Sequence, residues 1–275
     1  MTRIFIPTGR LSGKARTFPK VVADVRHAVF SVVINRPIGD GKYLSTALGS
    51  GFFVSSRVFL TCWHVINHPT NPHQEGDFYA LVNNLDGQNG IVHEVRQGVG
   101  KDIHLFFEQD LAILLSDSHP RQAFLPISYA DVPVGQEIGV AGYPLAQIIA
   151  DSNGNTTVSG AVFRVAKGVV TAYYTTVLNN GYGQILNDVK IVEVNFLFVP
   201  GNSGGPIFDA ETGRVMAFVE GFKPIKIAER KETCKLIPVP DGMSAEYLDS
   251  VYAVYSNGLT LALVRVHLEQ FGVEL

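Results

Sequence analysis

Three short segments carry side chains whose types could act together in acyl transfer. His64 is the last residue of the segment Thr61–His64, and Asp110 directly precedes an apolar run. Ser203 lies in the glycine-rich heptad PGNSGGP at 200–206. A serine hydroxyl is a weak nucleophile and needs an adjacent base, and histidine titrates near neutral pH. A carboxylate can then fix the imidazole tautomer and stabilise the imidazolium. These three residues therefore indicate nucleophilic catalysis by Ser203.

The glycines that flank Ser203 have a separate use. They let the backbone turn sharply and direct N–H groups into one space. We expect the N–H groups of Gly201 and Ser203 to meet the oxyanion of a tetrahedral intermediate.

Two acids lie between His64 and Ser203 at workable distances. Asp102 follows Gly100-Lys101 in a polar turn, so we expect it to face water. Asp110 opens the apolar run Leu111–Leu115, which should keep its carboxylate partly out of water. A partly buried carboxylate holds an imidazole better, so we assign Asp110 as the orienting acid.

The amino-acid composition excludes several classes of protein. The 275 residues are 46% hydrophobic and 17% charged, which excludes a disordered chain. The net charge of −3 gives no basic field for nucleic acid. No apolar run approaches the ~18 residues that span a membrane. Only two cysteines are present, Cys62 and Cys234, so we expect no disulfide framework and a cytoplasmic location.

The sequence pattern predicts that the segments around these residues are β-strands. Apolar, β-branched runs of strand length alternate with turn clusters, and 27 glycines and 14 prolines supply the turns. The pattern predicts an all-β protein in two units. The predicted strands are 28–34, 49–54, 58–66, 77–82, 90–95, 103–107, 111–115, 137–143, 160–174, 189–199, 206–209, 214–222 and 250–255.

The chain is divided accordingly. We expect an N-terminal arm over 1–20, a first β-barrel over 21–116, a linker over 117–135, a second barrel over 136–257 and a helix over 258–275. The helix shows a 3.6-residue apolar period, with Ser256 or Asn257 as possible N-cap.

The three segments, in their order, resemble the chymotrypsin-fold serine peptidases, and most closely the HtrA/Deg-type branch. Four segments resemble that branch: the strand pair GSGFFV and FLTCWHV that leads to the histidine, VAKGVVTA at 165–172, and PGNSGGPIFD. The resemblance implies two antiparallel six-stranded barrels. It places the triad of His64, Asp110 and Ser203 in the cleft between them.

The chain departs from relatives of this kind in two places. Only 53 residues follow Phe222, so we expect no PDZ domain after the protease unit. Secreted trypsins have an acid just before the serine that pairs with a cleaved N-terminus, and here Asn202 stands there. We therefore expect no activation by proteolytic cleavage.

The resemblance also suggests how substrate is bound. The residue six before the serine, Leu197, would line the base of the primary pocket and favour an apolar side chain. Phe218, Val219, Glu220 and Gly221 would form the edge strand that pairs with the substrate backbone. Glu220 opposes the expected apolar preference, because its charge could attract a basic substrate side chain instead.

Two alternatives stay open beside this interpretation. His64, His68 and His73 lie near Cys62 at spacings that could suggest zinc, but intervening prolines prevent a helix from aligning them, so we expect neither metal nor cofactor. The function is either a serine endopeptidase acting on polypeptides or a protease-fold binding or scaffolding protein. The latter would be inactive, or latent until a regulatory partner orders its oxyanion loop. The oligomeric state is left open.

Overall fold

The computed structural model describes most of the chain, with several gaps. The described residues are 9–10, 15–67, 72–83, 91–95, 100–116, 123–144, 147–150, 156–159, 162–179, 185–229, 236–238, 244–246 and 250–273. Within them the protein is mostly strand, with short helices at both ends. The predicted all-β class with a C-terminal helix is confirmed.

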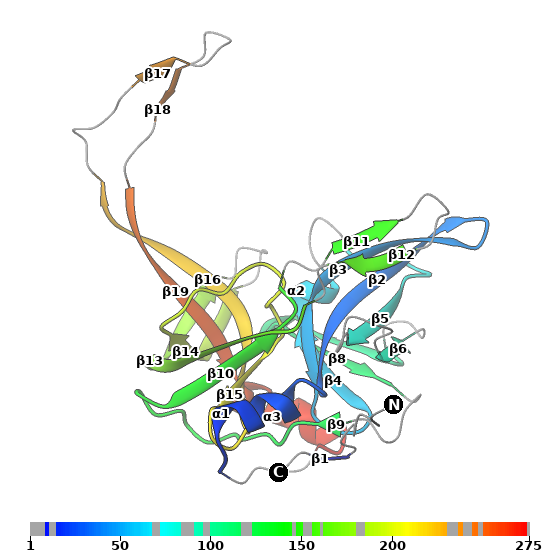
Figure 1. Cartoon of the computed structure of the whole chain (residues 1–275), viewed down its shortest axis with the longest axis horizontal. Helices are drawn as coiled ribbons and strands as arrows, with labels where there is room; N and C mark the ends of the chain where they lie inside the picture. Colours follow the sequence, from blue (N-terminus) through cyan, green and yellow to red (C-terminus); the bar gives the residue numbers. More distant parts are fainter. Residues whose placement is uncertain are drawn as a thin grey trace.

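The first half of the chain forms a seven-stranded antiparallel sheet (Figure 1). Among the described residues its strand order is β6-β5-β2-β3-β4-β8-β7, a seven-stranded ladder where the resemblance implied six strands. The strands are β2 (Val29–Gly39), β3 (Lys42–Phe53), β4 (Val58–Cys62), β5 (Phe78–Asn83), β6 (Ile91–Val95), β7 (Ile103–Phe106) and β8 (Leu111–Leu115).

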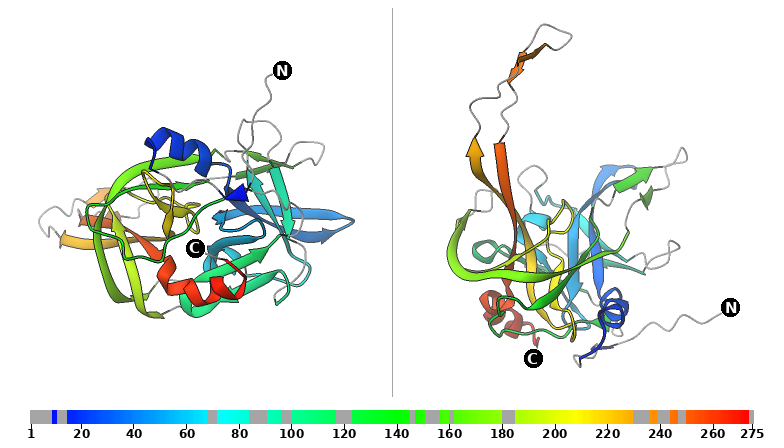
Figure 2. Two further views of the ribbon diagram at one scale, coloured as in Figure 1. Left: turned by 90° about the horizontal axis from the view of Figure 1, so that it is seen from below. Right: turned by 60° about the vertical axis from the view of Figure 1, so that its left-hand side comes forward.

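The second half forms a closed six-stranded barrel, as the resemblance implied. The order is β10-β13-β14-β19-β16-β15, with each neighbouring pair antiparallel. The strands are β10 (Glu137–Gly142), β13 (Arg164–Asn179), β14 (Ile185–Val194), β15 (Pro206–Asp209), β16 (Val215–Glu229) and β19 (Ser250–Thr260). Beyond the barrel, β16 and β19 continue as a paired ribbon that projects from the molecule (Figures 1 and 2).

Smaller elements complete the structure. The helices are α1 (Phe18–Val25), α2 (Trp63–Ile66), the 3-10 turn η1 (Phe107–Gln109) and α3 (Leu261–Gln270). Three two-stranded pairs are β1 (Gly9–Arg10) with β9 (Ala123–Phe124), β11 (Gln147–Ala150) with β12 (Thr156–Ser159), and β17 (Leu236–Pro238) with β18 (Ser244–Glu246). Of the helices in the described ranges, none is long and apolar enough to cross a membrane.

Both ends of the chain differ in detail from expectation. Helix α1 begins inside the predicted arm and buries Val21 and Val25. Helix α3 begins at Leu261 with Thr260 as its N-cap, so the expected caps Ser256 and Asn257 are wrong. Residues 256–259 pair with both β14 and β16, because the barrel closes there, and this pairing overrides the helical period.

Two apolar clusters stabilise the sheets. One fills the barrel around Val140, Val192 and Val219. The other runs from the first sheet into the barrel and contains Phe52 and Phe218. The two halves therefore share part of one core, which keeps the segments between them at fixed positions.

Gly204 shows how closely the halves approach. Its φ is +82°, in the left-handed region, and a Cβ there would lie 2.3 Å from both the Ser50 carbonyl oxygen and Thr61 Oγ1. Only glycine fits this backbone and this contact.

We therefore predict that Gly204→Ala destabilises the protein by more than the ~1–2 kcal/mol that the left-handed backbone alone costs. Thermal unfolding measures the effect. The matched control is Gly221→Ala, whose Cβ would meet nothing within 4 Å and which should unfold near the wild-type temperature. Equal unfolding temperatures for the two variants would contradict the prediction.

Candidate active site

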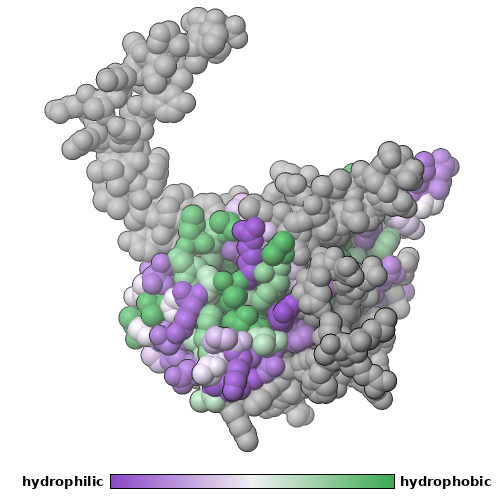
Figure 3. Space-filling model, in the orientation of Figure 1, coloured by the Kyte–Doolittle hydropathy of each residue, from purple (hydrophilic) through white to green (hydrophobic). Residues whose placement is uncertain are grey.

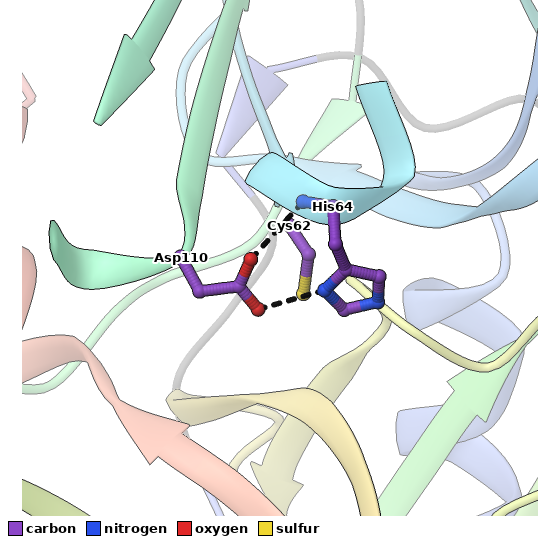
Figure 4. A group of neighbouring side chains, drawn as sticks. All are labelled: Cys62, His64 and Asp110. Carbon is purple, nitrogen blue, oxygen red and sulfur yellow. Dashed lines mark hydrogen bonds and ion pairs between the residues drawn. The ribbon is translucent and has the colours of Figure 1, made fainter. Parts of the chain in front are cut away.

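A buried carboxylate holds the histidine at two points (Figure 4). Asp110 Oδ1 accepts the backbone N–H of His64 at 3.0 Å, and its Oδ2 lies 2.8 Å from His64 Nδ1. The Asp110 residue is 0% exposed and His64 is 3% exposed. The imidazole is therefore fixed in position and orientation by one side chain.

Local structure explains this meeting. Strand β4 ends at Cys62 and the chain turns at once into α2, which presents His64. Asp110 follows η1 in a left-handed conformation, with φ of 45°, just before β8. Strands β4 and β8 pair in the register Cys62↔Leu111, and the Trp63 N–H donates to the Asp110 carbonyl at 3.0 Å. Neighbouring strand ends thus bring the two functional residues together.

The environment of His64 shifts its titration in two directions. Burial lowers the pKa of His64, whereas the charge of Asp110, the hydrogen bond to it and the charge of Glu220 raise it. The raising effects win, so the pKa lies above the usual histidine value. The site therefore favours an imidazolium, the form a histidine takes after accepting a proton.

Asp102 lies away from this pair. Its carbonyl accepts the N–H of Leu115, which is at the opposite end of β8 from Asp110. Of the two acids that the sequence offers, the one bonded to His64 is Asp110.

The loop that carries Ser203 turns tightly between β14 and β15. The Asn202 N–H donates to the Val199 carbonyl at 3.0 Å, and the Gly205 N–H donates to the Asn202 carbonyl at 2.9 Å. Gly201 has a φ of +95°, which suits glycine at this turn. The Ser203 hydroxyl donates to the Glu220 carbonyl at 3.4 Å, a long and weak contact for an O–H donor.

The N–H groups of Gly201 and Ser203 differ from those of their neighbours in their hydrogen bonding. In the described part of the chain, neither N–H donates to a backbone carbonyl, whereas those of Asn202, Gly204 and Gly205 do. Two N–H donors of one turn that are not bonded to a backbone carbonyl can bind an oxyanion.

Ser50 fixes this loop to the first sheet. Its N–H donates to the Ser203 carbonyl at 2.9 Å and its hydroxyl donates to the Gly201 carbonyl at 2.6 Å. The same hydroxyl accepts the Tyr143 N–H at 2.8 Å. Sequence reasoning did not identify Ser50; the available signal was a serine between two glycines in an apolar strand.

Cys62 adds a buried thiol to the site. Its Sγ donates to the Val219 carbonyl at 3.1 Å, and burial, with the charges of Asp110 and Glu220, raises the pKa of the thiol far above its usual value. Ligand atoms of Cys62, His64 and Asp110 lie within 4.8 Å of one another. The raised pKa of Cys62 disfavours the thiolate that would bind a metal, and His64 Nδ1 faces Asp110, so the arrangement suits hydrogen bonding.

Of the other two histidines considered for zinc, His73 is described and has its own partner. His73 stacks on Tyr79, with Nδ1 2.9 Å from the tyrosine hydroxyl. His68 and Cys234 lie outside the described residues.

The expected substrate residues are placed unevenly. Phe218 and Val219 are wrong as edge-strand residues, because their backbones pair with β19 on one side and with Pro206 and Gly205 on the other. Barrel closure uses these positions for the fold. Past Val219, the described pairing of β16 is with β19 and resumes at Gly221, while the Glu220 carbonyl accepts the Ser203 hydroxyl.

Leu197 is part of an open surface. It is 55% exposed, whereas the adjacent Phe198 is buried. Apolar side chains gather on the face of the barrel that Figure 3 shows. An exposed leucine can contribute apolar surface to a substrate site, but it does not form an enclosed pocket base.

A comparison with protein families matches more than half of the chain. The sequence model of the trypsin-like peptidase domain matches residues 49–217. The uncharacterized protein y4bJ of Sinorhizobium fredii (strain NBRC 101917 / NGR234) is 28% identical over 178 residues, which is 63% of this chain but only 22% of that protein's length.

Solved structures show the same fold. The HtrA-type protease AlgW, crystallised with a decapeptide, matches with a TM-score of 0.57 at 17% identity, over 92% of this chain and 67% of AlgW. The active form of the Rv3671c protease from M. tuberculosis matches with a TM-score of 0.56 at 18% identity, over 100% of this chain and 94% of that one.

Proposed function

The chain belongs to the trypsin-like peptidase family, and from this premise we propose that it is a serine endopeptidase with Ser203 as nucleophile, His64 as base and Asp110 as orienting acid. The observation that carries the proposal is the two-point hold of buried Asp110 on His64. A buried, oriented and basic histidine beside a glycine-rich serine loop is the arrangement that serine activation requires.

The reaction proceeds in two halves. The Ser203 hydroxyl gives its proton to His64 Nε2 as Oγ attacks the peptide carbonyl carbon. The resulting oxyanion is bound by the N–H groups of Gly201 and Ser203, and His64 then donates the proton to the leaving amine. Water repeats the sequence on the acyl-enzyme, so the serine is regenerated and the carboxylic acid leaves.

Asp110 supports each proton transfer. With Nδ1–H directed at Asp110 Oδ2, the other nitrogen of His64 carries the lone pair that accepts the serine proton. When His64 becomes charged, the neighbouring carboxylate stabilises it, which is the same effect that raises the pKa of the histidine.

The substrate is an extended polypeptide. Its backbone would lie along β16 near Glu220 and Gly221, next to the loop that carries Ser203. We propose an apolar side chain before the scissile bond, because exposed Leu197 offers apolar surface and no acid stands at this position.

The competing function is a protease-fold binding or scaffolding protein, held latent until a partner orders its oxyanion loop. The bonds from Ser50 to the carbonyls of Gly201 and Ser203 favour the active enzyme, since they hold the loop in place without a partner. The cytoplasmic location stays a prediction from cysteine content.

Replacing the nucleophile tests the proposal. Ser203→Ala should abolish covalent labelling by a fluorophosphonate probe and peptide hydrolysis, because it removes the proposed nucleophilic hydroxyl. The fold should persist, as shown by an unchanged thermal unfolding temperature. Labelling at the wild-type rate in the variant would refute the assignment; absence of labelling in the wild type would favour the binding protein.

The orienting acid is tested by a matched pair of variants. Asp110→Asn keeps the shape but reverses the hydrogen-bond polarity toward Nδ1, so the wrong tautomer is favoured and turnover should fall by about 10⁴. Asp102→Asn should stay within several-fold of wild type, because Asp102 lies at the far end of β8. Steady-state kcat on one peptide substrate decides between them, and the reverse pattern would transfer the role to Asp102.

Specificity can be read from a peptide library. We expect cleavage mainly after small or medium apolar residues, as Leu197 offers no charge to a basic side chain. Mass-spectrometric mapping of the cleaved bonds gives the preference. Dominant cleavage after Lys or Arg would contradict the prediction.

A further inference from the structure

A second carboxyl group is buried beside the Asp110–His64 pair. Glu220 is only 6% exposed, although the sequence placed it on the substrate-binding edge. Carboxylates are rarely buried to this degree without a partner or a function, because leaving water is costly for a charge. What Glu220 faces therefore decides its role.

The backbone of β16 changes its pairing at Glu220. Val219 pairs with Gly258 and Gly221 pairs with Asn257, so Glu220 is the extra residue of a β-bulge. A bulge redirects a side chain and is common beside active sites.

Neighbours on both sides show where this bulge lies. The Val219 side chain belongs to the barrel core, and its carbonyl accepts the Cys62 thiol at the end of β4. The Glu220 carbonyl accepts the Ser203 hydroxyl. Glu220 thus lies where β16 contacts both the loop that carries Ser203 and strand β4, which leads into His64.

The charge of Glu220 acts on this site. It raises the pKa of His64 and also that of Cys62. Among the described residues, the charges that act on His64 are those of Asp110 and Glu220, one from β8 and one from β16, while the thiol of Cys62 from β4 is protonated and neutral. Asp110, just before β8, and Glu220 from β16 therefore both act electrostatically on the imidazole of His64.

We propose that Glu220 is a positioning residue of the catalytic site, whose buried carboxylate stabilises the imidazolium of His64 together with Asp110. The inference rests on the proposed peptidase function, in which Ser203 transfers its proton to His64. With both carboxylates ionised, the site carries two negative charges when His64 is neutral and a net charge of −1 when His64 is protonated. The second carboxylate thus makes His64 a stronger base and moves the pH at which it becomes active upward.

Titration of the His64 ring tests this without relying on catalysis. In ¹⁵N-histidine-labelled Ser203→Ala protein, the further change Glu220→Gln should lower the His64 pKa, because it removes one negative charge. The change Glu220→Asp keeps the charge and should retain most of the elevation. Glu193→Gln is the control, because the Glu193 carboxylate accepts the Tyr174 hydroxyl on the barrel wall and should leave His64 unaffected.

Two further measures keep the result decisive. Glu220→Ser is a second neutral replacement, in case the glutamine disturbs folding, and it should lower the pKa in the same direction. In the enzyme that retains Ser203, Glu220→Gln should move the acid limb of kcat/KM to lower pH by the same amount, whereas a purely structural role would lower activity equally at every pH.

The outcomes separate the two proposals. A His64 pKa that is the same with Glu, Gln and Ser at position 220 overturns the role of Glu220 and leaves the peptidase assignment standing. A wild-type protein without hydrolysis or labelling refutes the peptidase, whereas a lowered His64 pKa in the Ser203→Ala background would still support the effect of Glu220 on the histidine.

Discussion

The hydrogen-bonded contact between Asp110 and His64 is the constraint on which the site depends. A carboxylate with no solvent exposure needs donors for both oxygens, and His64 supplies them from its backbone and its ring. This requirement fixes the register of β4 on β8 and the short turn of α2, since a shift of one residue would leave the carboxylate without donors. The geometry that stabilises a buried charge thereby also orients a base.

The loop that carries Ser203 is held in place by different contacts. This loop belongs to the barrel, but Ser50 of the first sheet holds it, and Gly204 is pressed against the carbonyl of the same Ser50. The two halves are therefore joined at the place where their functional residues must meet. We infer that stability of the interface and alignment of the site depend on the same few contacts.

Much of this could be predicted from sequence, since residue type and order identify the motif. The choice of Asp110 over Asp102 needed only the apolar run that follows Asp110. The start of α3 was missed because barrel closure keeps Asn257 in a strand, and no local period records a long-range pairing. Glu220 was read as substrate-facing for the same kind of reason: a bulge and the approach of β4 to β16 are tertiary facts.

The most direct test of the central claim is the crystal structure of the protein after reaction with a peptidyl fluorophosphonate. The account predicts a covalent bond from phosphorus to Ser203 Oγ, with the phosphoryl oxygen within hydrogen-bond distance of the N–H groups of Gly201 and Ser203. His64 should then lie between the adduct and Asp110. An adduct on another residue, or a phosphoryl oxygen directed away from those two N–H groups, would contradict the account.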